Sequence, residues 1–172
     1  SRILGSRFMQ ATAPGEAVGV MLPNTNGVVL SLLGLSSAGQ VAAMINYTAG
    51  PASVTAAIRT AIIHTVVSSR AFIEKAGLDD IVKAVEAGGA KLLWLGDIRA
   101  GISGFDKLAA ALLWRRPLRT QDAKEPAVIL FTSGSEGTPK AVVLSHRNLV
   151  ANAMQAEARI SVSPADTLLH VL

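Results

Sequence analysis

The sequence contains no cysteine in its 172 residues, and aromatic side chains make up only 4% of it. The lack of cysteine excludes a disulfide scaffold and fits a reducing compartment. Basic residues are scattered, and the formal net charge is only +4. Because aromatic and clustered basic side chains are the mark of a nucleic-acid-binding surface, we expect no nucleic-acid partner.

Charged side chains are absent from residues 17–58. A membrane span needs about 20 continuous apolar residues, whereas Pro23, Asn24 and Gly39 divide this stretch into pieces of strand or helix length. Residues 1–10 carry two arginines but no apolar segment behind them, so no signal peptide is predicted. We therefore expect no transmembrane segment and a cytoplasmic location, with attachment of the whole protein to the inner face of the cell membrane as an open alternative.

Strand-like and helix-like patterns alternate along the chain. Strands are expected at 17–22, 41–45, 64–68, 91–95, 127–131, 141–144 and 167–171, and helices at 26–38, 51–62, 72–87 (with a break near Gly77), 106–113 and from 146 or 148 to 159. This alternation predicts βαβ units, and therefore an α/β fold with a largely parallel sheet and helices on both faces. The length fits one domain, 1–172, with 114–125 as a linker that leads into the strand at 127.

The segment 131–148 reads FTSGSEGTPKAVVLSHRN and holds the strongest functional signal. Four hydroxyls, two glycines and a lysine fall within the nine residues 132–140. Glycine lets backbone N–H groups fold around an oxyanion, and Lys140 adds positive charge for the outer phosphates. The pattern predicts a phosphate cradle for a nucleotide. The alternative is a Ser/Gly turn of a hairpin with a solvated lysine, which leaves this composition unexplained.

Two better-known glycine motifs do not fit the segment. A Walker A loop that began at Gly134 would need glycine where Pro139 stands and a hydroxyl where Ala141 stands. A nucleophile elbow would need glycine in place of Ser133 and a helix after Ser135, whereas a strand is expected there. A P-loop NTPase and an α/β-hydrolase are therefore not supported.

The order of these residues resembles the signature loop of the AMP-forming acyl-adenylate superfamily, which includes acyl-CoA synthetases, luciferases and peptide-synthetase adenylation domains. Its usual form is Thr-Ser-Gly-Ser/Thr-Thr-Gly-x-Pro-Lys-Gly. Here Glu136 replaces the commoner threonine, and Ala141 replaces the last glycine. The resemblance implies that the loop holds the β- and γ-phosphates of ATP through Thr132, Ser133, Gly134, Ser135, Glu136, Gly137, Thr138, Pro139 and Lys140.

The two departures from the usual loop have different expected consequences. Glu136 has two open interpretations, a contact with a metal-bound water or a surface position that points away from the phosphates. The methyl group of Ala141 is expected to tighten the turn without abolishing the cradle.

The pair Ser135-Glu136 is also similar to the acyl-acyl-carrier-protein synthetases found in bifunctional 2-acylglycerophosphoethanolamine acyltransferases, as are residues 21–24 and 43–50. The resemblance covers roughly 15–152. It implies an ATP- and Mg²⁺-dependent ligase that activates a fatty acid as acyl-adenylate and transfers it to acyl-carrier protein, in fatty acid metabolism and phospholipid acyl turnover. A fatty acyl-CoA ligase is one alternative, and a non-catalytic nucleotide- or phosphate-binding module is another.

Later motifs of the superfamily are missing from this sequence. They include an adenine- and Mg²⁺-binding Tyr-Gly-x-Thr-Glu, a ribose-binding aspartate and a C-terminal catalytic lysine, and the acyltransferase motif His-x-x-x-x-Asp is missing as well. We therefore expect an incomplete N-terminal portion of an acyl-adenylate synthetase large domain, without the C-terminal lid domain, a catalytic residue or a metal site. Such a piece should be inactive and should self-associate through exposed apolar surface.

Other conspicuous residues favour structural roles. Ser145 or Asn148 is expected to cap the helix that follows it, and Trp94 and Trp114 are expected to pack in the core or at the domain edge. Nothing in the chemistry of residues 46–48 assigns them a function, so we interpret them as structural. No carboxylate or cysteine cluster accompanies the histidines that would suggest a metal site.

Overall fold

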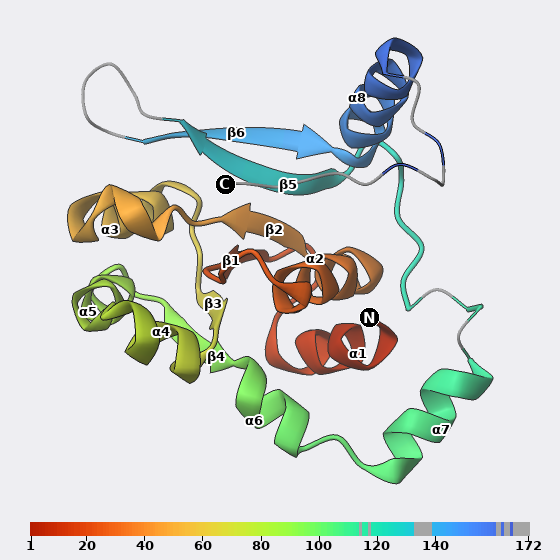
Figure 1. Cartoon of the computed structure of the whole chain (residues 1–172), viewed down its shortest axis with the longest axis horizontal. Helices are drawn as coiled ribbons and strands as arrows, with labels where there is room; N and C mark the ends of the chain where they lie inside the picture. The colour runs from red at the N-terminus through yellow and green to blue at the C-terminus, as the bar shows by residue number, and fades with distance from the viewer. Residues whose placement is uncertain (114, 117, 133–138, 161–162, 164–165, 167–172) are drawn as a thin grey trace.

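The computed structural model describes the whole chain except residues 114, 117, 133–138, 161–162, 164–165 and 167–172. In the described part, a six-stranded sheet lies between two layers of helices (Figure 1). The elements are α1 (Arg2–Ala11), β1 (Ala17–Val20), α2 (Asn26–Ala38), β2 (Val41–Met44), the 3₁₀ helix η1 (Tyr47–Ala49), α3 (Pro51–Thr60), β3 (Thr65–Ser68), α4 (Arg70–Ala76), α5 (Asp79–Ala87), β4 (Lys91–Trp94), α6 (Leu95–Ala100), α7 (Gly104–Leu112), β5 (Pro126–Thr132), β6 (Lys140–Ser145) and α8 (His146–Arg159).

The strands follow the order β4-β3-β1-β2-β5-β6 across the sheet. β1 to β5 run parallel, and β6 pairs antiparallel with β5. The chain leaves β1 toward β2 but leaves β3 toward β4 on the other side, so the direction of winding reverses between β1 and β3. In open α/β sheets, ligands bind outside the carboxyl ends of strands at such a reversal. The predicted α/β class with a largely parallel sheet is confirmed.

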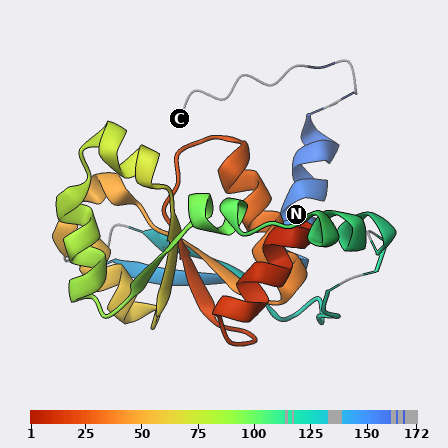
Figure 2. The same ribbon diagram turned by 90° about the horizontal axis from the view of Figure 1, so that it is seen from below.

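Helices cover both faces of the sheet, with α3, α4 and α5 on one face and α1 and α2 on the other (Figure 2). Successive residues of β2 alternate between these layers, as the period of a strand requires. Val41 and Ala43 belong to the core cluster that includes α3 and α5, whereas Ala42 belongs to the cluster that includes α1 and α2. Because both faces are buried, the strands of the segment 17–58 are apolar at every position, which explains its lack of charge.

Two glycines allow this close packing. A Cβ atom at Gly19 would lie 2.7 Å from Cδ1 of Ile45 and 2.8 Å from Cγ2 of Val66, so a side chain there would displace the core. Gly39 ends α2 with φ at 76°, the left-handed conformation typical of a helix C-cap. The turn at Gly39 lets β2 begin only two residues later.

Most predicted elements are present, with shifts of a few residues at their ends. α2 occupies the predicted range 26–38, and the long helix expected at 72–87 is divided into α4 and α5 by Gly77, whose φ is 62°. α6 was not predicted, because it follows β4 without a break and starts without a side-chain cap. The strand expected at 167–171 lies outside the described residues. Within the described part, no helix is long and apolar enough to cross a membrane.

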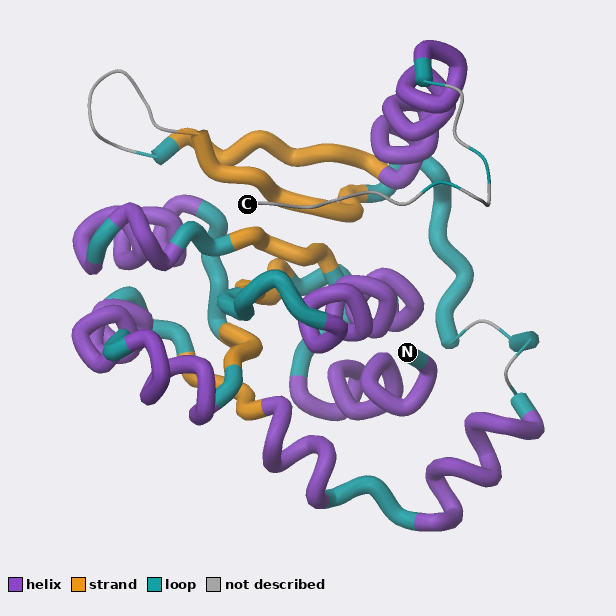
Figure 3. Tube along the Cα trace, in the orientation of Figure 1, coloured by secondary structure: helices purple, strands orange, loops and turns teal. Residues whose placement is uncertain are grey.

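The segment between α7 and β5 runs along the outer side of α1 and α2 (Figure 3). Leu118 lies against Gly5 of α1. The side-chain amide of Gln121 donates a hydrogen bond to the carbonyl of Ser36 in α2. These contacts join part of the predicted linker to the helical layer.

Candidate functional site

The predicted phosphate loop connects β5 to β6. Thr132 ends β5, Lys140 begins β6, and the two residues stand opposite each other in the antiparallel pair. The predicted ligands Ser133, Gly134, Ser135, Glu136, Gly137 and Thr138 lie outside the described residues, and Pro139 is half-buried. The structure therefore places the two ends of the loop together at the carboxyl end of β5.

Lys140 and Thr132 are both exposed at this edge. None of the described residues forms an ion pair with the ammonium of Lys140. A hydroxyl donates a single hydrogen bond, and an ammonium is a compact point charge with three donors, so the pair suits oxygens of a phosphate chain. Thr132 and Lys140 by themselves can bind and orient an anion.

The end of β2 lies beside the end of β5. The register pairs Met44 with Leu130, so Asn46 and Thr132, each two residues further along, lie at the same edge of the sheet. Oδ1 of Asn46 accepts hydrogen bonds from the backbone N–H of Thr48 at 3.0 Å and from its hydroxyl at 2.7 Å. This side chain holds the η1 turn, in agreement with the structural role predicted for residues 46–48.

Tyr47 connects that turn to the core below the loop. Its ring meets Phe72 edge-on, with centroids 5.1 Å apart and an angle of 72° between the ring planes. Tyr47, Phe131 and Ala141 are all partly buried against the same core cluster. Ala141 is the residue that replaces the usual glycine, and it pairs with Phe131 across the hairpin. Its methyl group therefore adds to the apolar packing beneath the loop.

The segment that follows β6 is structural. The hydroxyl of Ser145 accepts a hydrogen bond from the backbone N–H of Asn148 at 3.2 Å, and Oδ1 of Asn148 accepts one from the backbone N–H of Ser145 at 3.0 Å. This capping box confirms the predicted helix start. Nε2 of His146 lies 2.9 Å from Oε1 of Gln121, which anchors the ring at the surface.

One interaction at the carboxyl edge was missed by the sequence analysis. The guanidinium of Arg70 donates two hydrogen bonds to the carboxylate of Asp97, one of them 2.8 Å long, and its Cζ lies 4.8 Å above the ring of Trp94. The hydrogen bond from Arg70 lowers the pKa of Asp97. No spacing rule could have found this pair, because its members lie 27 residues apart. Trp94 packs at the domain edge, as predicted, and Trp114 lies outside the described residues.

A metal site made by the protein alone is not found in the part of the chain that the structure describes. There, no group of three or more His, Cys, Asp or Glu side chains could hold a metal ion. Mg²⁺ in nucleotide sites is commonly held by phosphates and by one or two carboxylates.

Comparisons with known proteins agree with the sequence of the loop. A family model described as AMP-binding enzyme matches residues 3–172. Sulfoacetate–CoA ligase of Cupriavidus necator is 33% identical over 167 residues, which are 92% of this chain and 30% of that protein. A medium/long-chain-fatty-acid–CoA ligase of Mycobacterium tuberculosis is 28% identical over 166 residues, which are 95% of this chain and 26% of that protein. The chain thus spans less than a third of the length of these relatives.

Solved structures share the fold. VinN in complex with 3-methylaspartate has a TM-score of 0.76 at 22% identity, over 94% of this chain and 42% of that chain. o-Succinylbenzoate CoA synthetase from Bacillus subtilis, in complex with its acyl-adenylate intermediate, has a TM-score of 0.73 at 13% identity, over 96% of this chain and 39% of that chain. The two curated relatives are CoA ligases, and they do not support the acyl-carrier-protein specificity predicted from Ser135-Glu136 and the stretches 21–24 and 43–50.

Proposed function

The chain belongs to the AMP-binding enzyme family, and on that premise we propose that it forms the phosphate-binding part of an ATP-dependent, AMP-forming acid–thiol ligase. The observation that carries the proposal is the position of Thr132 and Lys140. They face each other on paired strands at the carboxyl end of β5, at the two ends of the loop whose sequence resembles that of the superfamily.

The reaction of the whole protein would proceed in two steps. An oxygen of the carboxylate attacks the α-phosphorus of ATP, an acyl–phosphate bond forms, and the bond to the β-phosphate oxygen breaks to release pyrophosphate. A thiolate then attacks the acyl carbon and displaces AMP. Because negative charge grows on the leaving pyrophosphate, an ammonium positioned beside it lowers the barrier.

Lys140 would bind the outer phosphates as a point charge, and the hydroxyl of Thr132 would donate a hydrogen bond to one of their oxygens. Bound with the nucleotide, Mg²⁺ would supply further neutralisation of the phosphates. The η1 turn, which Asn46 holds by its hydrogen bonds and Tyr47 anchors on Phe72, would keep the end of β2 beside the end of β5. These residues bind and orient the nucleotide, and the remaining catalytic groups would come from outside this chain.

The relatives favour a carboxylic acid such as a fatty acid as the substrate and coenzyme A as the thiol. A second candidate acceptor is acyl-carrier protein, which is favoured only by the residues Ser135-Glu136 and the stretches 21–24 and 43–50. A cytoplasmic location, where ATP and both thiols occur, completes the proposal. We expect the 172-residue chain alone to release no pyrophosphate from ATP and a fatty acid.

Nucleotide binding to the chain tests the role of Lys140. We expect Lys140→Ala to weaken MgATP binding about tenfold or more in titration calorimetry, because it removes a charge-assisted hydrogen bond. Lys91→Ala is the matched control, since Lys91 is also exposed and also begins a strand, but at the opposite edge of the sheet. Equal affinities of the two variants would contradict the proposal. Tight binding that never supports acyl-adenylate formation in the whole protein would favour the non-catalytic module.

A further inference from the structure

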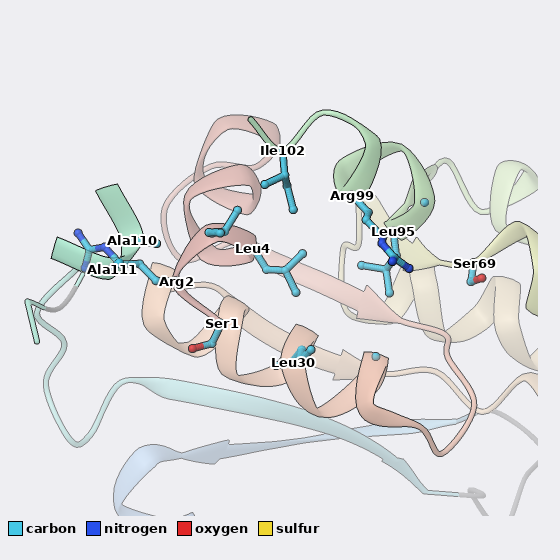
Figure 4. Close-up of a pocket in the computed structure, with 13 residues that line it drawn as sticks. Ser1, Arg2, Leu4, Leu30, Ser69, Leu95, Arg99, Ile102, Ala110 and Ala111 are labelled. Carbon is cyan, nitrogen blue, oxygen red and sulfur yellow. The ribbon is translucent and has the colours of Figure 1, made fainter. Parts of the chain in front are cut away.

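A crevice of about 930 Å³ lies outside the carboxyl ends of β1, β3 and β4, at the reversal of winding (Figure 4). Its walls come from α1, α2, α6 and α7 and are mostly apolar, with Leu4, Leu30, Leu95, Ile102 and Ala110 among the lining residues. Leu4 and Leu95 also pack against the core cluster beneath it. The floor of the crevice is therefore continuous with the folded core, and its volume is typical of a small-molecule site.

One cationic side chain in the crevice has no partner in the part of the chain that the structure describes. Arg99 reaches back from α6 along Leu95, and its guanidinium makes no hydrogen bond or ion pair with any residue that the structure describes (Figure 4). The neighbouring carboxylate of Asp97 is already occupied by Arg70. The second guanidinium of the lining, Arg2, donates to the carbonyl of Arg116, and Ser1 lines the crevice beside it. The crevice thus combines a largely apolar wall with a guanidinium that no described residue engages.

A hydroxyl stands on the same side of the crevice. Ser69 lines it at the end of β3, and its side chain makes no capping hydrogen bond to α4. Arg99 offers a planar fork that matches a carboxylate, and Ser69 offers one further donor. A carboxylate can take both donors of such a fork with one charged group, which leaves the rest of a ligand free to be as apolar as the wall.

We propose that this crevice binds a medium-chain alkyl carboxylate, with its head on Arg99 and Ser69 and its chain over Leu4, Leu30 and Leu95. This ligand is distinct from the acid that would react with ATP. Ser69 follows β3 and Thr132 ends β5, which lie three strand spacings apart, or roughly 14 Å. A carboxylate bound at Arg99 therefore lies well away from Thr132, and the inference does not rest on the proposed function.

Calorimetric titration of the chain with octanoate and decanoate, both below their micellar concentrations, tests the apolar wall. Each methylene buried in the crevice should improve the dissociation constant about fourfold, so decanoate should bind more than tenfold more tightly than octanoate. Leu30→Glu should remove this dependence on chain length. Leu30 is already 43% exposed, so the substitution should leave the fold intact, and circular dichroism of the variant checks this.

Substitution of the arginine tests the head group. Arg99→Gln should weaken decanoate binding about fivefold or more but leave decanol binding unchanged, because the alcohol carries no charge. Lys75→Gln is the control for net charge, since Lys75 is exposed in the last turn of α4 and does not line the crevice. Lys140→Ala should also leave decanoate binding unchanged, which separates this site from the phosphate loop.

Three outcomes would overturn the inference. The first is the absence of saturable decanoate binding, and the second is an equal affinity of Arg99→Gln and Lys75→Gln for decanoate. The third is binding that survives Leu30→Glu with its chain-length dependence intact, which would identify apolar adsorption elsewhere on the chain.

Discussion

The charge-free segment 17–58 and the C-terminal segment 126–159 are both rich in apolar side chains, but the fold buries them to very different extents. In the first segment, the central strands β1 and β2 are covered on both faces, and Val18 and Ala43 are fully buried. In the second, β6 occupies the edge of the sheet and Val143 is 55% exposed. Hydrophobicity thus shows which residues can be buried, whereas the position of a strand in the sheet decides whether they are.

Strand β5, which leads into the candidate phosphate loop, lies between the buried and the exposed parts of the sheet. β5 pairs with buried β2 on one side and with exposed β6 on the other. Burial changes along β5 itself, where Ile129 is buried and its neighbour Leu130 is 41% exposed. The end of β5 is therefore packed against β2 on one side, whereas on the other side it pairs with a strand that is exposed to solvent. An open side would let the proposed nucleotide reach Lys140.

Two methionines give the strongest test of this difference. Met21 is fully buried at the end of β1, and Met154 is 64% exposed on α8. Met21→Ala should lower the free energy of unfolding by about 2–5 kcal/mol, because it leaves a cavity in the core. Met154→Ala should change it by less than about 0.5 kcal/mol. Urea denaturation of both variants measures the contrast, and equal losses would show that α8 is packed as tightly as β1.

Two equally exposed apolar side chains should contribute differently to self-association of the chain. Val143 on β6 is 55% exposed and Leu33 on α2 is 54% exposed, but only Val143 lies on a strand that forms the edge of the sheet among the described residues. We expect the chain to self-associate through β6, and Val143→Glu to weaken that association about tenfold. Leu33→Glu should have little effect. Sedimentation velocity over a range of concentrations measures both, and a wild-type chain that stays monomeric at high concentration would contradict the expectation.

The two capping boxes provide the smallest expected effect. Ser145 caps α8 and Ser103 caps α7 with the same pair of hydrogen bonds. Ser145→Ala should destabilise α8 by about 1 kcal/mol, since few buried contacts support this helix. Ser103→Ala should loosen α7 less, because Arg7 still holds Asp106 through a 2.8 Å ion pair. Amide hydrogen exchange measures the loss of protection in each helix. If Ser145→Ala reduces the protection of α8 no more than Ser103→Ala reduces that of α7, then α8 has support beyond its cap.

Local features of the fold could be predicted, and long-range ones could not. The C-terminal end of α2 follows from a single residue, because Gly39 adopts a left-handed conformation that other residues avoid. The cap at Ser145 is a contact between residues three apart. In contrast, the Arg70–Asp97 pair joins elements 27 residues apart, and α6 has no capping side chain to mark its start. The Arg70–Asp97 pair could be recognised only from the strand order, which brings β3 beside β4.

The sequence by itself determined the alternation of strands and helices and a loop composition typical of a phosphate site. These features depend on the conformations and hydrogen bonds of neighbouring residues, which a short stretch of chain already contains. Only the tertiary structure decided that Thr132 faces Lys140, that Arg99 stands in an apolar crevice without a partner among the described residues, and that β6 lies at the edge of the described sheet with its valines exposed. These depend on the order of strands in the sheet, since burial and pairing are properties of groups that the chain brings together from distant positions.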